Sequence, residues 1–195
     1  SLIGSTGFLR VSSQNEQEQN ATFVHETMSR MPSFTDSLDA SNAAYVESFT
    51  AEGVPGRAGT HLLLLTCMDS RIVPHAIFGL KEGDMKVLRN AGGQMNSEVE
   101  RDIVLASHLL DCHNIVIMPH TKCAMASLSL TEVRTKLTDL SGMDFSSFEP
   151  RMTDDWEGKL RADVASLKAN ALLKEGVQVR GARYDVDTGM VTWVC

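Results

Sequence analysis

Residues 61–71 have the sequence HLLLLTCMDSR, in which four consecutive leucines end at polar residues. A short, unbroken apolar run is typical of a strand buried on both faces, and such strands occur in parallel sheets that helices cover. Parallel sheets bind their ligands beyond the carboxyl ends of the strands. Cys67, Asp69 and Arg71 follow the leucines directly. The stretch therefore predicts an α/β fold with a thiol, a carboxylate and a guanidinium at the edge where a site would form.

A second run of the same kind, NIVIM at residues 114–118, is followed by His120 and Cys123. The spacing His-x-x-Cys holds an imidazole and a thiol close together. If a helix begins just before Cys123, the thiol lies at its amino end, where the helix dipole favours a thiolate. Both predicted strands point at the same edge of the sheet. We therefore expect Cys67, His120 and Cys123 to meet in one Cys2His set.

The Cys2His set favours a catalytic zinc ion, because catalytic zinc commonly takes three protein ligands and leaves a fourth position open. A structural zinc site would need a fourth ligand, and no other Cys or His lies at a suitable spacing. Two alternatives are a Cys67–Cys123 disulfide and a nucleophilic Cys–His pair. The disulfide is disfavoured in a reducing compartment, and the nucleophilic pair leaves the second cysteine unexplained.

Composition limits the classes of partner and location. The 195 residues suffice for a sizeable core, and a net charge of −7 argues against binding to a nucleic acid. No apolar run approaches the length of a membrane span, and no signal-peptide pattern is visible at the amino end. Four cysteines in a chain of this length do not indicate a disulfide scaffold, which favours reduced thiols. We expect a cytoplasmic protein, with an organellar location after removal of a leader as the alternative.

We expect two parts: a tail and helical arm at residues 1–60, and an α/β zinc catalytic domain at residues 61–195. Residues 1–20 are polar and predict a loose tail, whereas residues 21–30 are weakly helical. Residues 37–50 have the apolar spacing of a helix. This arm has little core of its own, so it should lie on its own sheet or on a partner subunit.

For the catalytic domain we expect a mostly parallel four-stranded sheet flanked by helices, with a fifth, antiparallel edge strand. The predicted strands are residues 62–65, 85–88, 114–118, 177–182 and 190–194. The predicted helices are residues 74–80, 97–111, 123–140 and 154–174, the last being the longest. Residues 184–189 contain the turn residues of a hairpin, which makes the last strand antiparallel.

Other chemistry-bearing residues are weaker candidates. Residues 89–93, RNAGG, follow a predicted strand, and the two glycines allow close approach of the backbone to a ligand, although an ordinary turn explains them equally well. Cys112 and Cys195 are interpreted as small apolar residues. The remaining histidines are interpreted as surface or satisfied core residues: His25, His61, His75, His108 and His113.

Three motifs together resemble the β-class carbonic anhydrases: Cys-x-Asp-Ser-Arg at residues 67–71, Arg-Asn-Ala-Gly at 89–92 and His-x-x-Cys at 120–123. Their order and spacing agree with that family from about residue 62 to the terminal hairpin. The resemblance implies zinc binding by Cys67, His120 and Cys123, and a catalytic dyad formed by Asp69 and Arg71.

The resemblance also implies an activity and an assembly. The expected activity is reversible hydration of carbon dioxide to bicarbonate by a zinc-bound hydroxide. The expected assembly is a homodimer or higher homo-oligomer, in which the amino-terminal helices embrace the neighbour. Asp69 could instead occupy the fourth zinc position at lower pH. Hydrolysis of carbonyl sulfide or carbon disulfide on the same site is the alternative activity, and a non-catalytic zinc-stabilised dimerisation or sensing domain is the alternative class.

Two positions depart from the family pattern. Pro119 and Ala124 stand where the family usually has glycine. Proline removes a backbone donor and restricts φ, and alanine adds a methyl group next to a metal ligand. Neither change removes a ligand, so zinc binding should survive while the shape of the pocket differs.

Overall fold

The computed structural model describes residues 33–195. The chain divides into two units, Ser1–Glu52 and Gly53–Cys195, and the described part of the first unit begins at residue 33. The predicted tail at residues 1–20 and weak helix at residues 21–30 lie outside the described residues. The functional boundary placed at residue 60 stays a prediction.

The described part of the first unit contains one helix, α2 (Phe34–Glu47). It begins earlier than the predicted range of 37–50 because Ser33 forms a capping box with Asp36, each side chain accepting the other residue's backbone N–H. No residue of α2 is buried. The prediction of a helix in this part of the arm is confirmed.

The second unit is built on a five-stranded sheet in the order β2-β1-β3-β4-β5. The strands are β1 (Leu62–Cys67), β2 (Met85–Asn90), β3 (Asn114–Met118), β4 (Gln178–Tyr184) and β5 (Val191–Trp193). The first four strands pair in parallel, and β5 pairs with β4 in the antiparallel sense. The predicted fold class is confirmed. Strand β1 runs on to Cys67, beyond the leucines, because its last residue still pairs with Asn90 of β2.

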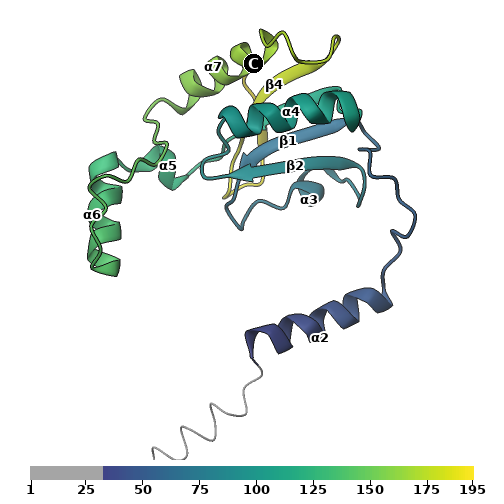
Figure 1. Cartoon of the computed structure of the whole chain (residues 1–195), viewed down its shortest axis with the longest axis horizontal. Helices are drawn as coiled ribbons and strands as arrows, with labels where there is room; N and C mark the ends of the chain where they lie inside the picture. The colour runs from purple at the N-terminus through teal and green to yellow at the C-terminus, as the bar shows by residue number, and fades with distance from the viewer. Residues whose placement is uncertain (1–32) are drawn as a thin grey trace, which may run out of the picture. The chain divides into compact units, whose positions relative to one another are not determined.

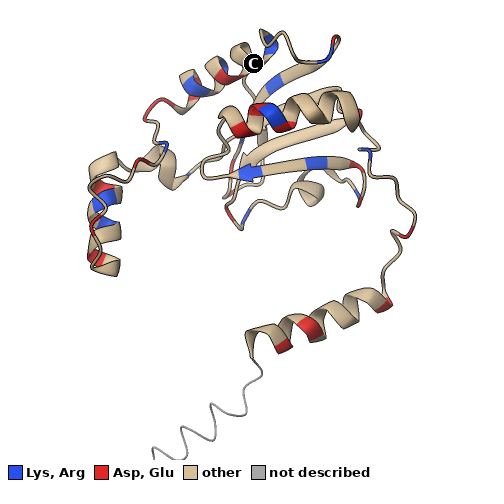
Figure 2. Ribbon diagram, viewed as in Figure 1, with Lys and Arg blue, Asp and Glu red and all other residues tan. Residues whose placement is uncertain are grey.

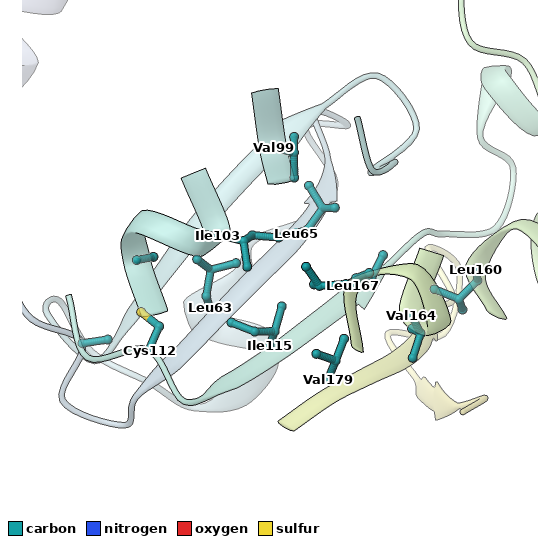
Figure 3. Packing of buried hydrophobic residues seen from close by; sticks show 13 residues of the cluster. Leu63, Leu65, Val99, Ile103, Cys112, Ile115, Leu160, Val164, Leu167 and Val179 are labelled. Atoms are coloured by element: carbon teal, nitrogen blue, oxygen red, sulfur yellow. The ribbon is translucent and has the colours of Figure 1, made fainter. Parts of the chain in front are cut away.

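Helices cover both faces of the sheet. Helices α4 (Ser97–Leu109) and α7 (Trp156–Lys168) lie on one face, and the short helix α3 (Pro74–Phe78) lies on the other (Figure 1). Alternate residues of β1 face opposite sides of the sheet. Leu63 and Leu65 pack with α4 and α7 (Figure 3). Leu64 packs on the side of α3. Strand β1 carries no charged residue, whereas α4 and α7 display charges (Figure 2). This is the pattern of a doubly covered parallel sheet.

Two helix predictions were wrong in extent. The predicted helix at 123–140 is two helices, α5 (Ala124–Ser127) and α6 (Leu130–Ser141), because Ser129 starts a new helix through a capping box with Glu132. Helix α7 ends at Lys168, not at residue 174, and with 13 residues it is shorter than α2 with 14. Beyond its end, the side chain of Asn170 accepts the backbone N–H of Leu172, which favours a turn over a further helical residue.

Within residues 33–195, none of the helices combines the length and the apolar character needed to cross a bilayer.

Candidate metal centre

Cys67 is the last residue of β1 and lies against the turn that follows β2. The backbone N–H of Gly92 donates to the sulfur of Cys67 over 3.3 Å. Gly93 has a φ of +63°, and a Cβ atom there would lie 2.8 Å from both the backbone nitrogen of Cys67 and the carbonyl carbon of Thr66. The two glycines therefore form a turn that contacts β1; the sequence predicted either such a turn or a close approach of the backbone to a ligand.

Arg89 of β2 fixes the loop that leaves β1. Its Nε donates to the carbonyl of Cys67 over 2.9 Å, and its Nη2 donates to the carbonyl of Asp69 over 2.7 Å. The side chain of Asn90 closes the following turn, since it both donates to the carbonyl of Gln94 and accepts the N–H of Gln94. Sequence reasoning gave Arg89 and Asn90 no role of their own. The only signal for them was their place in the RNAGG motif.

The second ligand loop leaves β3 and is fixed by β4. His120 forms a parallel bridge with Tyr184, and the N–H of Thr121 donates to the carbonyl of Tyr184 over 2.9 Å. Lys122 adopts a left-handed conformation with φ of 57°, which turns the chain, and Cys123 becomes the N-cap residue of α5. The thiol thus lies at the amino end of a helix, as predicted, although that helix has only four residues.

The structure brings the three predicted metal ligands together. One ligand atom from each of Cys67, His120 and Cys123 lies within 4.8 Å of the others, and all three residues are buried. Both ring nitrogens of His120 are buried without a hydrogen-bond partner. An unpartnered imidazole facing two thiols is costly unless something binds it. These donors fit a zinc ion, which prefers sulfur and imidazole nitrogen.

The two thiols perturb each other. Interaction with the Cys123 thiol, together with the nearby imidazole of His120 and the N–H of Gly92, lowers the pKa of Cys67. The same pairing with the Cys67 thiolate, together with burial, raises the pKa of Cys123. Cys67 is therefore the more acidic of the two thiols, and Cys123 retains its proton more strongly. A metal that binds both thiolates must displace that proton, so binding should release it.

Asp69 and Arg71 form the predicted pair beside the three ligands. Arg71 donates through Nε to Oδ1 of Asp69 over 2.9 Å and through Nη2 to Oδ2 over 2.7 Å. Oδ2 also lies 3.8 Å from Nε2 of His120. The hydrogen bonds from Arg71 hold the pKa of Asp69 well below its usual range. The carboxylate therefore stays ionised, and the stability it contributes is lost only as the pH falls through this lowered pKa.

The two departures from the family pattern leave the ligands in place. Pro119 keeps its carbonyl in use, since it accepts the N–H of Tyr184 over 3.0 Å. Ala124 is the first residue of α5 and is exposed, so its methyl group points into no crowded space. Pro119 lines a narrow cavity together with His120, Cys123 and Trp156. The proline therefore changes the wall of that cavity and not the ligand geometry.

The fold and the site define a class of protein: a doubly covered α/β domain with a candidate Cys2His metal site at the carboxyl ends of two neighbouring parallel strands. The family model described as carbonic anhydrase matches residues 62–191. The chain belongs to the carbonic anhydrase family, and its relatives identify the β class.

Individual relatives agree with this assignment. Beta-carbonic anhydrase 1 of Mycobacterium tuberculosis is 27% identical over 160 residues, which cover 82% of this chain and 97% of that protein. The crystal structure of carbonic anhydrase from Streptococcus mutans is 33% identical with a TM-score of 0.76, covering 85% of this chain and 99% of that one. Carbon disulfide hydrolase of Acidithiobacillus thiooxidans is 26% identical over 157 residues, covering 70% and 77%.

Replacing Gly93 by alanine should destabilise the fold, because it combines a left-handed φ with a contact of 2.8 Å to β1. Gly142→Ala is a matched control, since Gly142 has φ of +70° but no atom within 4 Å of an added Cβ. The control should lose about 1–2 kcal/mol from the left-handed backbone alone. Gly93→Ala should lose a further ~1–3 kcal/mol, as overpacked sites do. Urea unfolding measures both, and equal losses would show that the turn does not press on β1.

Proposed function

We propose that this protein catalyses the reversible hydration of carbon dioxide to bicarbonate with a zinc ion held by Cys67, His120 and Cys123. The observation that carries the proposal is the meeting of two thiols with an imidazole whose two nitrogens are buried and unpartnered. Membership of the carbonic anhydrase family supports the same reaction. Four free cysteines among the described residues support a reducing, cytoplasmic setting.

Bound zinc supplies a Lewis acid that lowers the pKa of water from about 16 toward about 7, which makes hydroxide available at neutral pH. The protein's own contribution is orientation. Asp69 stays ionised, so it accepts a hydrogen bond from the attacking water species and directs a lone pair of its oxygen toward the carbon of carbon dioxide. Arg71 holds Asp69 through two hydrogen bonds and neutralises its charge. Arg89 holds the loop from Cys67 to Asp69 in place, because it donates to the carbonyl oxygens of both residues.

A second substrate class, carbonyl sulfide or carbon disulfide, is the alternative for the same centre. The carbon disulfide hydrolase relatives support it, because they match this chain at similar identity. The ligands do not separate these linear molecules, each of which presents an electrophilic carbon. We favour carbon dioxide because the carbonic anhydrases of Mycobacterium and Streptococcus mutans cover 82% and 85% of this chain, against 70% for the carbon disulfide hydrolase of Acidithiobacillus thiooxidans.

We also propose that two copies of the chain form the smallest active assembly, through the arm. Helix α2 has no buried residue and displays large apolar side chains on its surface: Phe34, Leu38, Tyr45 and Val46. A helix of 14 residues is marginal in water without packing, so a covered apolar face would stabilise it. A partner subunit supplies that cover.

The preparation as isolated should contain one zinc per chain and hydrate carbon dioxide faster than it hydrolyses carbonyl sulfide or carbon disulfide. Metal analysis and the three rates on one preparation measure this. Chelation should abolish activity while circular dichroism retains the fold, because the sheet does not depend on the ion. Faster turnover of either sulfur compound would transfer the proposal to that substrate. Unfolding on chelation, in a protein without measurable turnover, would favour the non-catalytic zinc domain instead.

Asp69→Asn should retain zinc but hydrate carbon dioxide at least ~100-fold more slowly, since a positioned proton acceptor contributes a factor of about 10²–10⁴. The amide cannot accept and orient in the same way while it remains bonded to Arg71. Asp102→Asn, on the exposed side of α4, changes the same charge and should keep the normal rate. Stopped-flow hydration and metal content are the measurements. Near-normal hydration by Asp69→Asn would reject its catalytic role.

Introducing charge on the apolar face of α2 should separate the subunits. Leu38→Asp with Val46→Asp buries two carboxylates in the proposed contact, which is costly. Ala40→Asp with Ala43→Asp adds the same charge to the opposite face of the helix, which already carries Asp36 and Glu47. Sedimentation equilibrium should give the mass of one chain for the first pair and of two or more for the second. A multimeric first pair would place the subunit contact elsewhere.

A further inference from the structure

A second group of potential metal ligands lies at the opposite end of the sheet, before β1 and β3. We call His61, Asp111 and His113 the amino-edge cluster; one ligand atom from each lies within 4.8 Å of the others. His61 directly precedes β1, and Asp111 and His113 lie between α4 and β3. Cys67 is six positions after His61 along β1, which is ~20 Å of extended chain. The amino-edge cluster is therefore separate from the Cys2His centre.

The two imidazoles of the cluster lie against the carboxylate of Asp111. Nδ1 of His61 lies 3.3 Å from Oδ2 of Asp111, and Nε2 of His113 lies 2.6 Å from Oδ1. The two imidazole rings are 5.2 Å apart and tilted by 60°. A tetrahedral ion with bonds of about 2.0–2.1 Å keeps its ligand atoms about 3.4 Å apart. Nδ1 of His61 also lies 2.9 Å from the carbonyl oxygen of Asp111, so this ring must turn away from that carbonyl to hold an ion together with the other two side chains.

The backbone fixes these residues in unusual conformations. His61 and Asp111 both have positive φ, 58° and 61°, which non-glycine residues adopt at a cost. The carbonyl of His61 accepts the N–H groups of both His113 and Asn114 over 3.0 Å, which ties the two loops together. Two strained residues and a shared carbonyl present three metal-binding side chains on one side. Packing of the core alone does not require histidines here, because His61 and His113 are about half exposed.

Lys174 already places a positive charge beside the carboxylate of Asp111. Nζ of Lys174 lies 3.4 Å from Oδ1 of Asp111 and 3.5 Å from Nε2 of His113. Hydrogen bonds from His113 and Lys174 lower the pKa of Asp111, so the carboxylate is ionised. Lys174 is flexible and about one-third exposed, so it can withdraw to solvent. An ammonium group held beside an aspartate and an imidazole marks a position where a cation is favoured.

We propose that the amino-edge cluster is a second metal site, which takes a divalent late first-row transition cation. Two imidazoles and one carboxylate suit zinc, copper and nickel in preference to magnesium or calcium. The ion replaces the ammonium group of Lys174 and bridges the loop before β1 to the loop before β3. It thereby fastens the amino ends of the two strands whose carboxyl ends carry Cys67 and His120. This inference does not depend on the reaction catalysed at the Cys2His centre.

The test uses the full-length protein with its Cys2His centre already loaded with one zinc. Titration with Zn²⁺ alone, followed by calorimetry, should show a second equivalent per chain and a rise in the melting temperature. His113→Ala and Asp111→Asn should weaken that second equivalent at least ~10-fold, since even partners outside the ligand shell contribute 10- to 100-fold to affinity. Asparagine tolerates the left-handed φ of position 111, so this variant should fold.

Two further variants complete the test. Lys174→Gln should tighten binding of the second equivalent, because it removes a competing cation 3.4 Å from Asp111. His108→Ala removes a histidine of α4 that contacts Leu172 and not the cluster, so it should leave the affinity unchanged. The first zinc should stay bound in all four variants. Absence of a second equivalent in the wild-type chain, or equal affinity in His113→Ala and His108→Ala, would overturn the proposal.

Discussion

The parallel pairing of β1 with β3 is the constraint on which the metal centre depends. The register places Thr66 opposite Met118, and the buried hydroxyl of Thr66 donates to the carbonyl of Met118 over 2.7 Å. The next residues on each strand enter the two ligand loops. A shift by one residue would turn Cys67 to the other face of the sheet, because side chains alternate along a strand. The buried leucines and isoleucines on both faces hold that register against a shift.

Two arginines hold the loop after β1 through different groups. Arg89 binds its carbonyl groups, and Arg71 binds the carboxylate of Asp69. Because guanidinium groups stay charged at any ordinary pH and donate in a fixed plane, they position an anion without competing for the protons of the site. The Asp69 carboxylate is thereby kept ionised close to His120.

Strands β1 and β3 have polar side chains at both ends, and the two ends differ in kind. The carboxyl ends carry buried sulfur and nitrogen ligands, whereas the amino ends carry the half-exposed amino-edge cluster. Pro119 and Ala124 are accommodated at the carboxyl ends because neither backbone position needs the conformational freedom of glycine: the carbonyl of Pro119 is bonded to Tyr184, and Ala124 starts a helix. Lys122, between the ligands His120 and Cys123, supplies the left-handed turn instead.

The amino-acid pattern by itself predicted the doubly covered parallel sheet, the antiparallel last strand and the meeting of Cys67, His120 and Cys123, because runs such as LLLL and NIVIM favour buried strands that end at one edge. It did not determine the break at Ser129 or the end of α7 at Lys168, since capping side chains outweighed a continuing apolar period. It also interpreted His61 and His113 individually as surface or satisfied core residues. Only the tertiary structure placed them beside Asp111, and only it joined Arg89 to the carbonyls of Cys67 and Asp69. These residues are about 20 to 50 positions apart in the chain and meet through strand pairing. The local periodicity of the sequence does not predict contacts over such separations.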